Sequence, residues 1–160
     1  METASVARPV RRSRSNPKRM IFTLLQANRA LPLVQRIVAD IVRQYKKVCA
    51  LEERCHIRRP NVTEEEQGVL RRDYTNELFK LRNLSEELRA VGCELKDWRM
   101  GLVDFLSIHD GREVELCWRL GEERIEYWHD IETGFSGRQL VDESFGGTAS
   151  PRPQPADVGA

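Results

Sequence analysis

Apolar residues recur every three or four positions over residues 34–49, which is the spacing of one face of an amphipathic helix. They are Val34, Ile37, Val38, Ile41, Val42, Tyr45, Val48 and Cys49. Upstream, Thr23 and Gln26 have the spacing of a capping box, and Pro32 suits the first turn of a second, longer helix. The apolar stripe is wide, which favours a helix that faces a core over the narrow seam of a coiled coil.

A further amphipathic helix is predicted after Pro60. Thr63 and Glu66 have capping-box spacing, apolar residues then recur at helical intervals, and Gly92 suits the C-terminal cap. Because the link between the helices is short, they are expected to fold back as a long antiparallel hairpin.

The pattern changes to alternation at Gly101. Asp110-Gly111 is a strong signal for a two-residue type I′ turn, which pairs His109 with Arg112. On one face this register places the pairs Ser107 with Val114, Phe105 with Leu116 and Val103 with Trp118. The opposite face receives Asp104 beside Cys117 and Leu106 beside Glu115. A slip of one residue would bury the acids, so the register is well specified.

A third strand is predicted over Ile125–Ile131. A connecting loop of two or of four residues keeps Tyr127 and His129 on the apolar face, and the four-residue loop also sets Arg119 opposite Glu126. The outer face would then collect the acids Asp104, Glu113, Glu115, Glu126 and Asp130 around Trp128 and Cys117. The predicted fold is α+β: a long antiparallel helical hairpin packed on a small three-stranded antiparallel β-meander.

The two ends of the chain differ in composition from the centre. Residues 1–20 are rich in Arg, Ser and Pro, and the C-terminal residues are rich in Gly, Pro and Ala. Neither segment can bury enough apolar surface to offset its ordering entropy. We expect a disordered basic tail over residues 1–20, a single domain over residues 21–141 and a disordered tail over residues 142–160.

Charge is balanced overall at +1, but it is unevenly placed. Residues 101–143 hold 11 acids and 4 bases, a net of −7, whereas residues 1–100 hold 21 bases and 13 acids, a net of +8. This asymmetry favours self-association or an intramolecular fit. The basic tail lacks interleaved aromatic residues and a binding module, so specific nucleic-acid binding is not expected.

Several function classes are not indicated. There is no apolar run of membrane-spanning length and no signal-peptide core, and the four cysteines lack CxxC spacing. Reduced thiols in a cytoplasmic protein are therefore expected, rather than a disulfide or zinc framework. Glu53 and His56 have the spacing of a di-iron half-site, but the second helix has no histidine, which favours a surface salt-bridge cluster.

The acidic face is the first candidate site. Clustered carboxylates on neighbouring strands repel one another unless a metal, an arginine or a raised pKa neutralises them. Asp104, Glu115 and Asp130 are the candidate metal ligands, with Trp128 and His129 as walls, since strand alternation directs His129 away from Asp104. The alternative, which we favour, is a solvated acidic face with His129 at the edge of the core.

The second candidate is the loop Gly134-Phe135-Ser136-Gly137-Arg138. Backbone N–H groups freed by Gly134 and Gly137, together with the Arg138 guanidinium, could hold a carboxylate or phosphate. Alternatively, and with more support, Arg138 turns back to neutralise Asp104 or Glu115 while Phe135 fills the core.

Several short stretches resemble an uncharacterised bacterial family, domain of unknown function 2203. The stretches are Phe22-Thr23, Ala27-Asn28, Leu31-Pro32, Gly101-Leu102-Val103-Asp104-Phe105, Gly111-Arg112-Glu113-Val114, Leu116-Cys117-Trp118, Gly121-Glu122, Tyr127-Trp128-His129 and Gly134-Phe135-x-Gly137-Arg138. The resemblance covers roughly residues 21–140 and implies a prokaryotic cytoplasmic protein, but no activity. Two departures are Leu25-Gln26, where acids are usual, and Leu106, where proline is usual.

Two functions from different classes stay open. We favour a non-catalytic binding or scaffolding module, because the apolar stripe of the hairpin exceeds what a small meander can cover; its partner would be a second copy, giving a homodimer, or another protein. The alternative is a metal- or small-anion-binding domain, enzymatic or not. The sequence requires no cofactor, leaves a divalent metal open and does not favour an enzyme. If the acids only repel one another, Asp104→Ala or Asp130→Ala should stabilise the fold.

Overall fold

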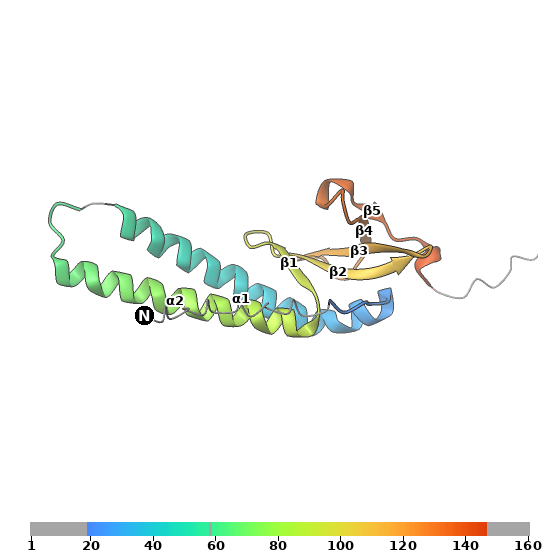
Figure 1. Ribbon diagram of the computed structural model, residues 1–160, viewed down its shortest axis with the longest axis horizontal. Coiled ribbons are helices and arrows are strands. Elements are labelled where there is room, and N and C mark those ends of the chain that lie inside the picture. Colours follow the sequence, from blue (N-terminus) through green and yellow to red (C-terminus); the bar gives the residue numbers. More distant parts are fainter. Residues whose placement is uncertain (1–18, 58, 147–160) are drawn as a thin grey trace, which may run out of the picture.

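The computed structural model describes residues 19–57 and 59–146. In these residues two helices, α1 (Leu24–His56) and α2 (Glu64–Val91), precede a five-stranded antiparallel sheet. Its strands are β1 (Glu94–Asp97), β2 (Leu102–His109), β3 (Arg112–Arg119), β4 (Tyr127–Asp130) and β5 (Gln139–Leu140). The helices form a long hairpin, and the sheet covers the half of it that holds the start of α1 and the end of α2 (Figure 1).

The helix caps match the sequence prediction. Thr23 and Thr63 each accept a hydrogen bond from the backbone N–H three residues on, and the Gln26 and Glu66 side chains each accept one from the backbone N–H of the cap residue. Gly92 ends α2 with a left-handed conformation, φ 104°. One prediction was wrong: Pro32 does not begin a new helix but lies inside α1. No helix in the described part of the chain has an apolar stretch long enough to cross a bilayer.

The β2–β3 hairpin has the predicted register at every pair. Asp110 and Gly111 occupy the turn with φ of 49° and 73°, and Asp104 lies opposite Cys117. The prediction of three strands was incomplete, because β1 and β5 extend the sheet on either side in the order β1-β2-β3-β4-β5. Both added strands are short, four and two residues, which is too few for an alternation pattern to stand out.

The register of β4 corrects the sequence prediction and decides the composition of the site. Cys117 pairs with Tyr127, which leaves the nine residues 118–126 between them, an odd number where the predicted loops were even. Every side chain of β4 therefore faces the opposite way. Trp128 lies on the inner face opposite Leu116, and His129 lies on the outer face opposite Glu115.

Two hydrogen bonds outside the sheet ladder hold the segment of nine residues between Cys117 and Tyr127 in place. Asn28 of α1 accepts a hydrogen bond from Ile125 N–H at 2.9 Å, and Ile125 is buried against the core. The Trp118 indole N–H donates to the Glu122 carbonyl at 2.9 Å. These two contacts tie the loop to the helix and to the largest core side chain.

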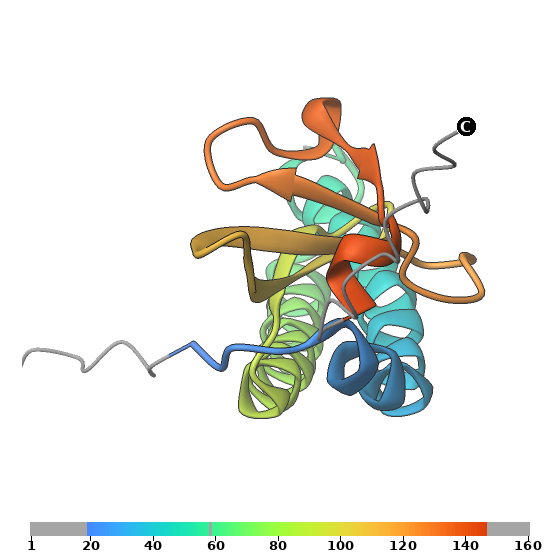
Figure 2. The ribbon, with the colours of Figure 1, turned by 90° about the vertical axis from the view of Figure 1, so that its right-hand side faces the viewer.

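The core lies between the hairpin and the inner face of the sheet (Figure 2). Val103, Phe105, Val114, Leu116 and Trp118 pack there against the apolar stripe of α1. The short segment before α1 lies along the part of β2 beyond its pairing with β1, where Phe22 N–H donates to the Leu106 carbonyl at 2.7 Å. This edge contact brings the Arg19 side chain to the outer face of the sheet.

Candidate functional site

The outer face of the sheet buries three charged or polar side chains. Asp104 is 1% exposed, Glu115 2% and His129 2%, and the neighbouring Cys117 is fully buried. Charged groups are rarely buried to this extent without partners, because desolvation of an ion costs several kcal/mol. The four residues come from β2, β3 and β4, where Asp104 pairs with Cys117 and Glu115 with His129 across neighbouring strands.

Asp104, Cys117 and His129 form a compact cluster. One carboxylate oxygen, the thiol sulfur and one imidazole nitrogen all lie within 4.8 Å of one another. His129 Nε2 lies 3.1 Å from Asp104 Oδ2, and His129 Nδ1 lies 2.8 Å from the backbone carbonyl of Asp130. The imidazole is therefore fixed at both nitrogens.

The bond to the carbonyl determines what the other nitrogen can do. A carbonyl oxygen only accepts hydrogen bonds, so Nδ1 of His129 must carry a proton. In a neutral imidazole Nε2 is then an acceptor that faces a second acceptor, Asp104 Oδ2. The contact needs either one more proton or a cation. Asp104 Oδ1 is also buried and has no hydrogen-bond partner within the described residues.

Cys117 completes the cluster without the properties of a nucleophile. Burial raises the pKa of its thiol to about 12, Asp104 adds to the rise, and Arg138 opposes it. A reactive cysteine needs a lowered pKa and an exposed sulfur. An oxygen, a sulfur and a nitrogen donor on three neighbouring strands match the ligand set of Zn²⁺ sites better than they match a catalytic dyad.

Glu115 is neutralised by a residue from the N-terminal segment. Arg19 Nη1 and Nη2 donate to its two carboxylate oxygens at 2.7 and 2.8 Å, a bidentate pair. In a second ion pair, Arg19 Nε lies 3.5 Å from the carboxylate of Glu94 on β1. The hydrogen bond to Glu115 raises the pKa of Arg19 above its usual value against the effect of burial. Glu115 therefore already has its counter-charge.

Arg138 is held by neighbours other than those predicted. It pairs with Glu122 at 2.8 Å, donates to the Cys117 carbonyl at 3.3 Å and lies over the Tyr127 ring at 4.1 Å. Phe135 does not fill the core but remains 39% exposed, with Arg138 5.0 Å above its ring. Gly134 has φ 62° and accepts a hydrogen bond from Gly137 N–H in a tight turn. The guanidinium is thus directed at the strand that carries Cys117.

The structure divides the predicted site residues into two groups. Asp104 and Glu115 lie on the outer face as predicted, and His129, which was predicted to point away, joins them. Asp130 instead lies 3.3 Å from Arg112, and Trp128 packs on the inner side near His109 and Phe145. Cys117 had been placed on this face but not as a ligand, and Arg19 had been assigned to the tail.

The comparisons with known proteins give a family and no function. No curated protein matches the chain, and no solved structure matches it. Residues 20–141 match a family described as an uncharacterized conserved protein, and this range contains both helices, the sheet and every residue of the cluster. The chain therefore belongs to the DUF2203 family.

Proposed function

We propose that this protein binds one Zn²⁺-like ion through Asp104, Cys117 and His129. The observation that carries the proposal is the contact of two acceptors, His129 Nε2 and Asp104 Oδ2, beside a buried oxygen of Asp104 without a partner. A cation between these atoms satisfies all of them. The hydrogen bond from Nδ1 to a backbone carbonyl is the usual support for a histidine that ligates through Nε2.

The charge around the cluster also favours a cation. Glu94, Glu115 and Glu122 contribute three negative charges near the site, and Arg19, Lys96 and Arg138 offset them. A Cys117 thiolate and the Asp104 carboxylate add two more. A divalent ion would bring this group of charges close to neutrality, which a buried site requires.

The burial of the ligands favours a structural role for the ion. Catalytic zinc sites leave one position open to water or substrate, whereas structural sites are closed. Three protein ligands leave the fourth tetrahedral position to a water molecule. Because all three side chains are at most 2% exposed, that position would be closed to a substrate, and the ion would tie β2, β3 and β4 together. The site would therefore belong to a non-catalytic binding domain.

Cobalt substitution tests this site directly. Metal-free protein titrated with Co²⁺ should bind one equivalent and develop a sulfur-to-cobalt charge-transfer band together with the intense d–d bands of a tetrahedral site. Zn²⁺ should displace the cobalt. Zn²⁺ at a hundred times its dissociation constant should also raise the free energy of unfolding by about 2.7 kcal/mol.

A second buried cysteine supplies the matched control. Cys93 is 4% exposed and, like Cys117, has a pKa raised to about 12 by burial, but it does not belong to the cluster. Cys117→Ser should abolish the charge-transfer band, and Cys93→Ser should retain it. A wild-type titration without a sulfur band, or a band that survives Cys117→Ser, would refute the metal site.

A second candidate function, self-association through the hairpin, is favoured by the part of α1 and α2 beyond the sheet. Within the described chain, α1 has no buried residue after Val48 and α2 has none before Leu81. Apolar side chains are nevertheless present in this part, and Phe79 is 60% exposed. A two-helix hairpin without a core of its own gains stability from a second pair of helices.

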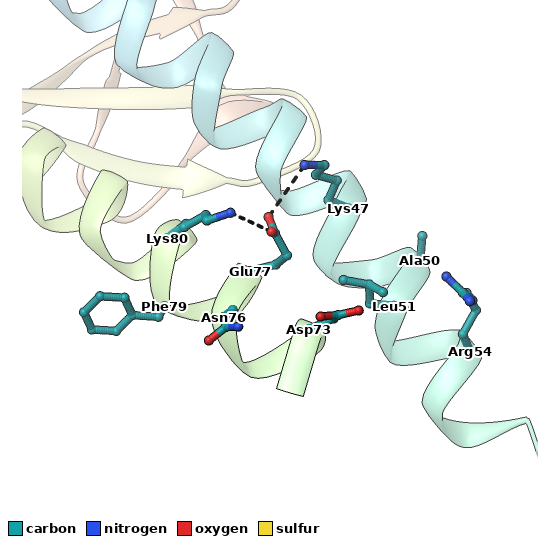
Figure 3. Close-up of a pocket in the computed structure, with 9 residues that line it drawn as sticks. All are labelled: Lys47, Ala50, Leu51, Arg54, Asp73, Asn76, Glu77, Phe79 and Lys80. Atoms are coloured by element: carbon teal, nitrogen blue, oxygen red, sulfur yellow. Dashed lines mark hydrogen bonds and ion pairs between the residues drawn. The ribbon is translucent and has the colours of Figure 1, made fainter. Parts of the chain in front are cut away.

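A groove of about 570 Å³ lies between the two helices in this region (Figure 3). Arg54 of α1 and Asp73 of α2 line it on opposite sides, with Leu51 between them. The groove lies on the side of α1 away from the sheet. Tyr45 contacts Trp98 in the turn between β1 and β2, and Arg54 follows Tyr45 by nine residues, two and a half helical turns.

We propose that a second copy of the chain occupies this groove. A twofold axis parallel to the hairpin places α1 of each copy over α2 of the other, so that Arg54 faces the partner's Asp73 twice. Within the described residues, neither Arg54 nor Asp73 forms an ion pair inside its own chain.

Charge reversal with mixing tests the dimer. Arg54→Glu and Asp73→Arg should each raise the dimer dissociation constant about tenfold in sedimentation experiments, because each homodimer then holds two like-charged contacts. An equimolar mixture should recover the wild-type value, since both contacts in the mixed dimer are between opposite charges. A monomeric wild type, or no recovery on mixing, would contradict the arrangement.

A further inference from the structure

The guanidinium of Arg138 is held rigidly beside the cluster. Its Cζ atom lies 4.1 Å from the centre of the Tyr127 ring and 5.0 Å from the centre of the Phe135 ring, and Nη2 donates to Glu122 at 2.8 Å. Glu122 is itself fixed, because it also accepts from Arg119 N–H at 2.8 Å. The side chain of Arg138 is only 12% exposed. The guanidinium of Arg138 therefore has a fixed orientation next to β3, the strand that carries Cys117.

One donor of this guanidinium has no acceptor. Nε of Arg138 is buried and makes no hydrogen bond within the described residues, although Nη2 of the same group reaches the backbone carbonyl of Cys117. A buried N–H without an acceptor costs about 1–3 kcal/mol, more for a charged group. Such an atom can take an acceptor that the described residues do not supply.

The nearby acceptor that metal binding would strengthen is the sulfur of Cys117. A thiol sulfur is a weak acceptor, whereas a thiolate ligated to a metal is a negatively charged one. Arg138 approaches this residue through the contact of Nη2 with the Cys117 carbonyl, so the sulfur and Nε belong to groups that already touch. Hydrogen bonds to the ligands are the usual outer support of a metal centre.

We propose that Arg138 is a positioning residue for the metal ligand Cys117, donating a hydrogen bond from Nε to the thiolate once the ion is bound. This inference rests on the metal site proposed above. It assigns the cation of the Gly134–Arg138 loop to the ligand sulfur rather than to an external carboxylate or phosphate. It also gives a role to the ion pair between Arg138 and Glu122, which connects the β3–β4 loop to the site.

The energy of the sulfur-to-cobalt charge-transfer band tests this hydrogen bond. Removal of a donor from a thiolate raises the energy of its electrons, so Arg138→Met should shift the band to lower energy. The affinity for Co²⁺ should fall about 10- to 100-fold, the usual effect of losing an outer-shell partner. Arg138→Lys should behave in the same way, because lysine keeps the charge but lacks the planar Nε donor.

A nearby arginine provides the control. Arg124 is 72% exposed and pairs with Glu126, so Arg124→Met should leave both the band and the affinity unchanged. If Arg138→Met leaves the band energy unchanged, the proposed hydrogen bond is absent. If Arg138→Lys binds like the wild type, only charge matters and the inference is also overturned. Failure of the metal site itself is distinguishable, because the wild type would then show no sulfur band at all.

Discussion

Arg19→Met is expected to reduce the free energy of unfolding by about 3–4 kcal/mol, although Arg19 lies at the edge of the domain. Its guanidinium is bidentate to Glu115, whose side chain is 2% exposed. Removing one partner of a buried ion pair leaves the other charge buried and uncompensated, which costs about 3–5 kcal/mol. Arg19 is itself 30% exposed, and solvent that reaches Glu115 in the variant places the loss at the lower end of that range.

Urea denaturation at neutral pH measures this loss, and an exposed arginine gives the matched control. Arg112 lies 3.3 Å from Asp130, but the two side chains are 63% and 39% exposed, so Arg112→Met should change stability by at most about 0.5 kcal/mol. Equal effects of the two substitutions would mean that Glu115 does not depend on Arg19. The double variant Arg19→Met/Glu115→Leu should be more stable than Arg19→Met alone, because no buried charge remains.

Arg19 also shows where composition stops being informative. Residues 1–20 look like a solvated tail because Arg, Ser and Pro dominate them and apolar residues are few. Composition does not distinguish the last arginine from those before it. The distinction comes from Phe22, which attaches the segment to the edge of β2 and so carries Arg19 to Glu115.

The parts of the fold that the sequence predicted are those encoded by neighbours along the chain. The capping boxes at Thr23 and Thr63 need only residues three positions apart, and the Asp110-Gly111 turn sets the whole register of β2 and β3. Pro32 was misjudged because a proline normally begins, kinks or breaks a helix. Here α1 continues through it, between the buried residues Leu31 and Val34.

The register of β4 depended on contacts that no local pattern contains. The apolar residues of Ile125–Ile131 suit either face, and an odd or even loop could not be told apart without Asn28 of α1, which binds Ile125 N–H. The consequence reached the site directly, because the odd loop moved His129 beside Asp104. Cys117 was likewise missed as a member of the cluster, since Asp104, Cys117 and His129 are brought together by two strand registers rather than by a short spacing.

His129→Ala is expected to have the largest effect of all on the metal-free protein, a loss of about 4 kcal/mol. The substitution removes the only hydrogen-bond partner that the described residues offer to the Asp104 carboxyl group, whose other oxygen has none. It therefore leaves an acid that is 1% exposed without any partner, and it also leaves a cavity. Denaturation in the presence of a chelator isolates this contribution from that of an ion.

The aspartates on either side of His129 decide whether the loss comes from the buried pair. Asp104→Ala should cost about 2 kcal/mol, because a neutral His129 keeps its bond to the Asp130 carbonyl but loses its partner at Nε2. Asp130→Ala should change stability by at most about 0.5 kcal/mol, since its carboxylate is exposed. If Asp104→Ala stabilised the metal-free fold instead, repulsion among the acids would outweigh the bond to His129. Zn²⁺ would bind to Asp104 and His129 but not to Asp130. In saturating metal, the loss of unfolding free energy should therefore grow for Asp104→Ala and His129→Ala and stay the same for Asp130→Ala.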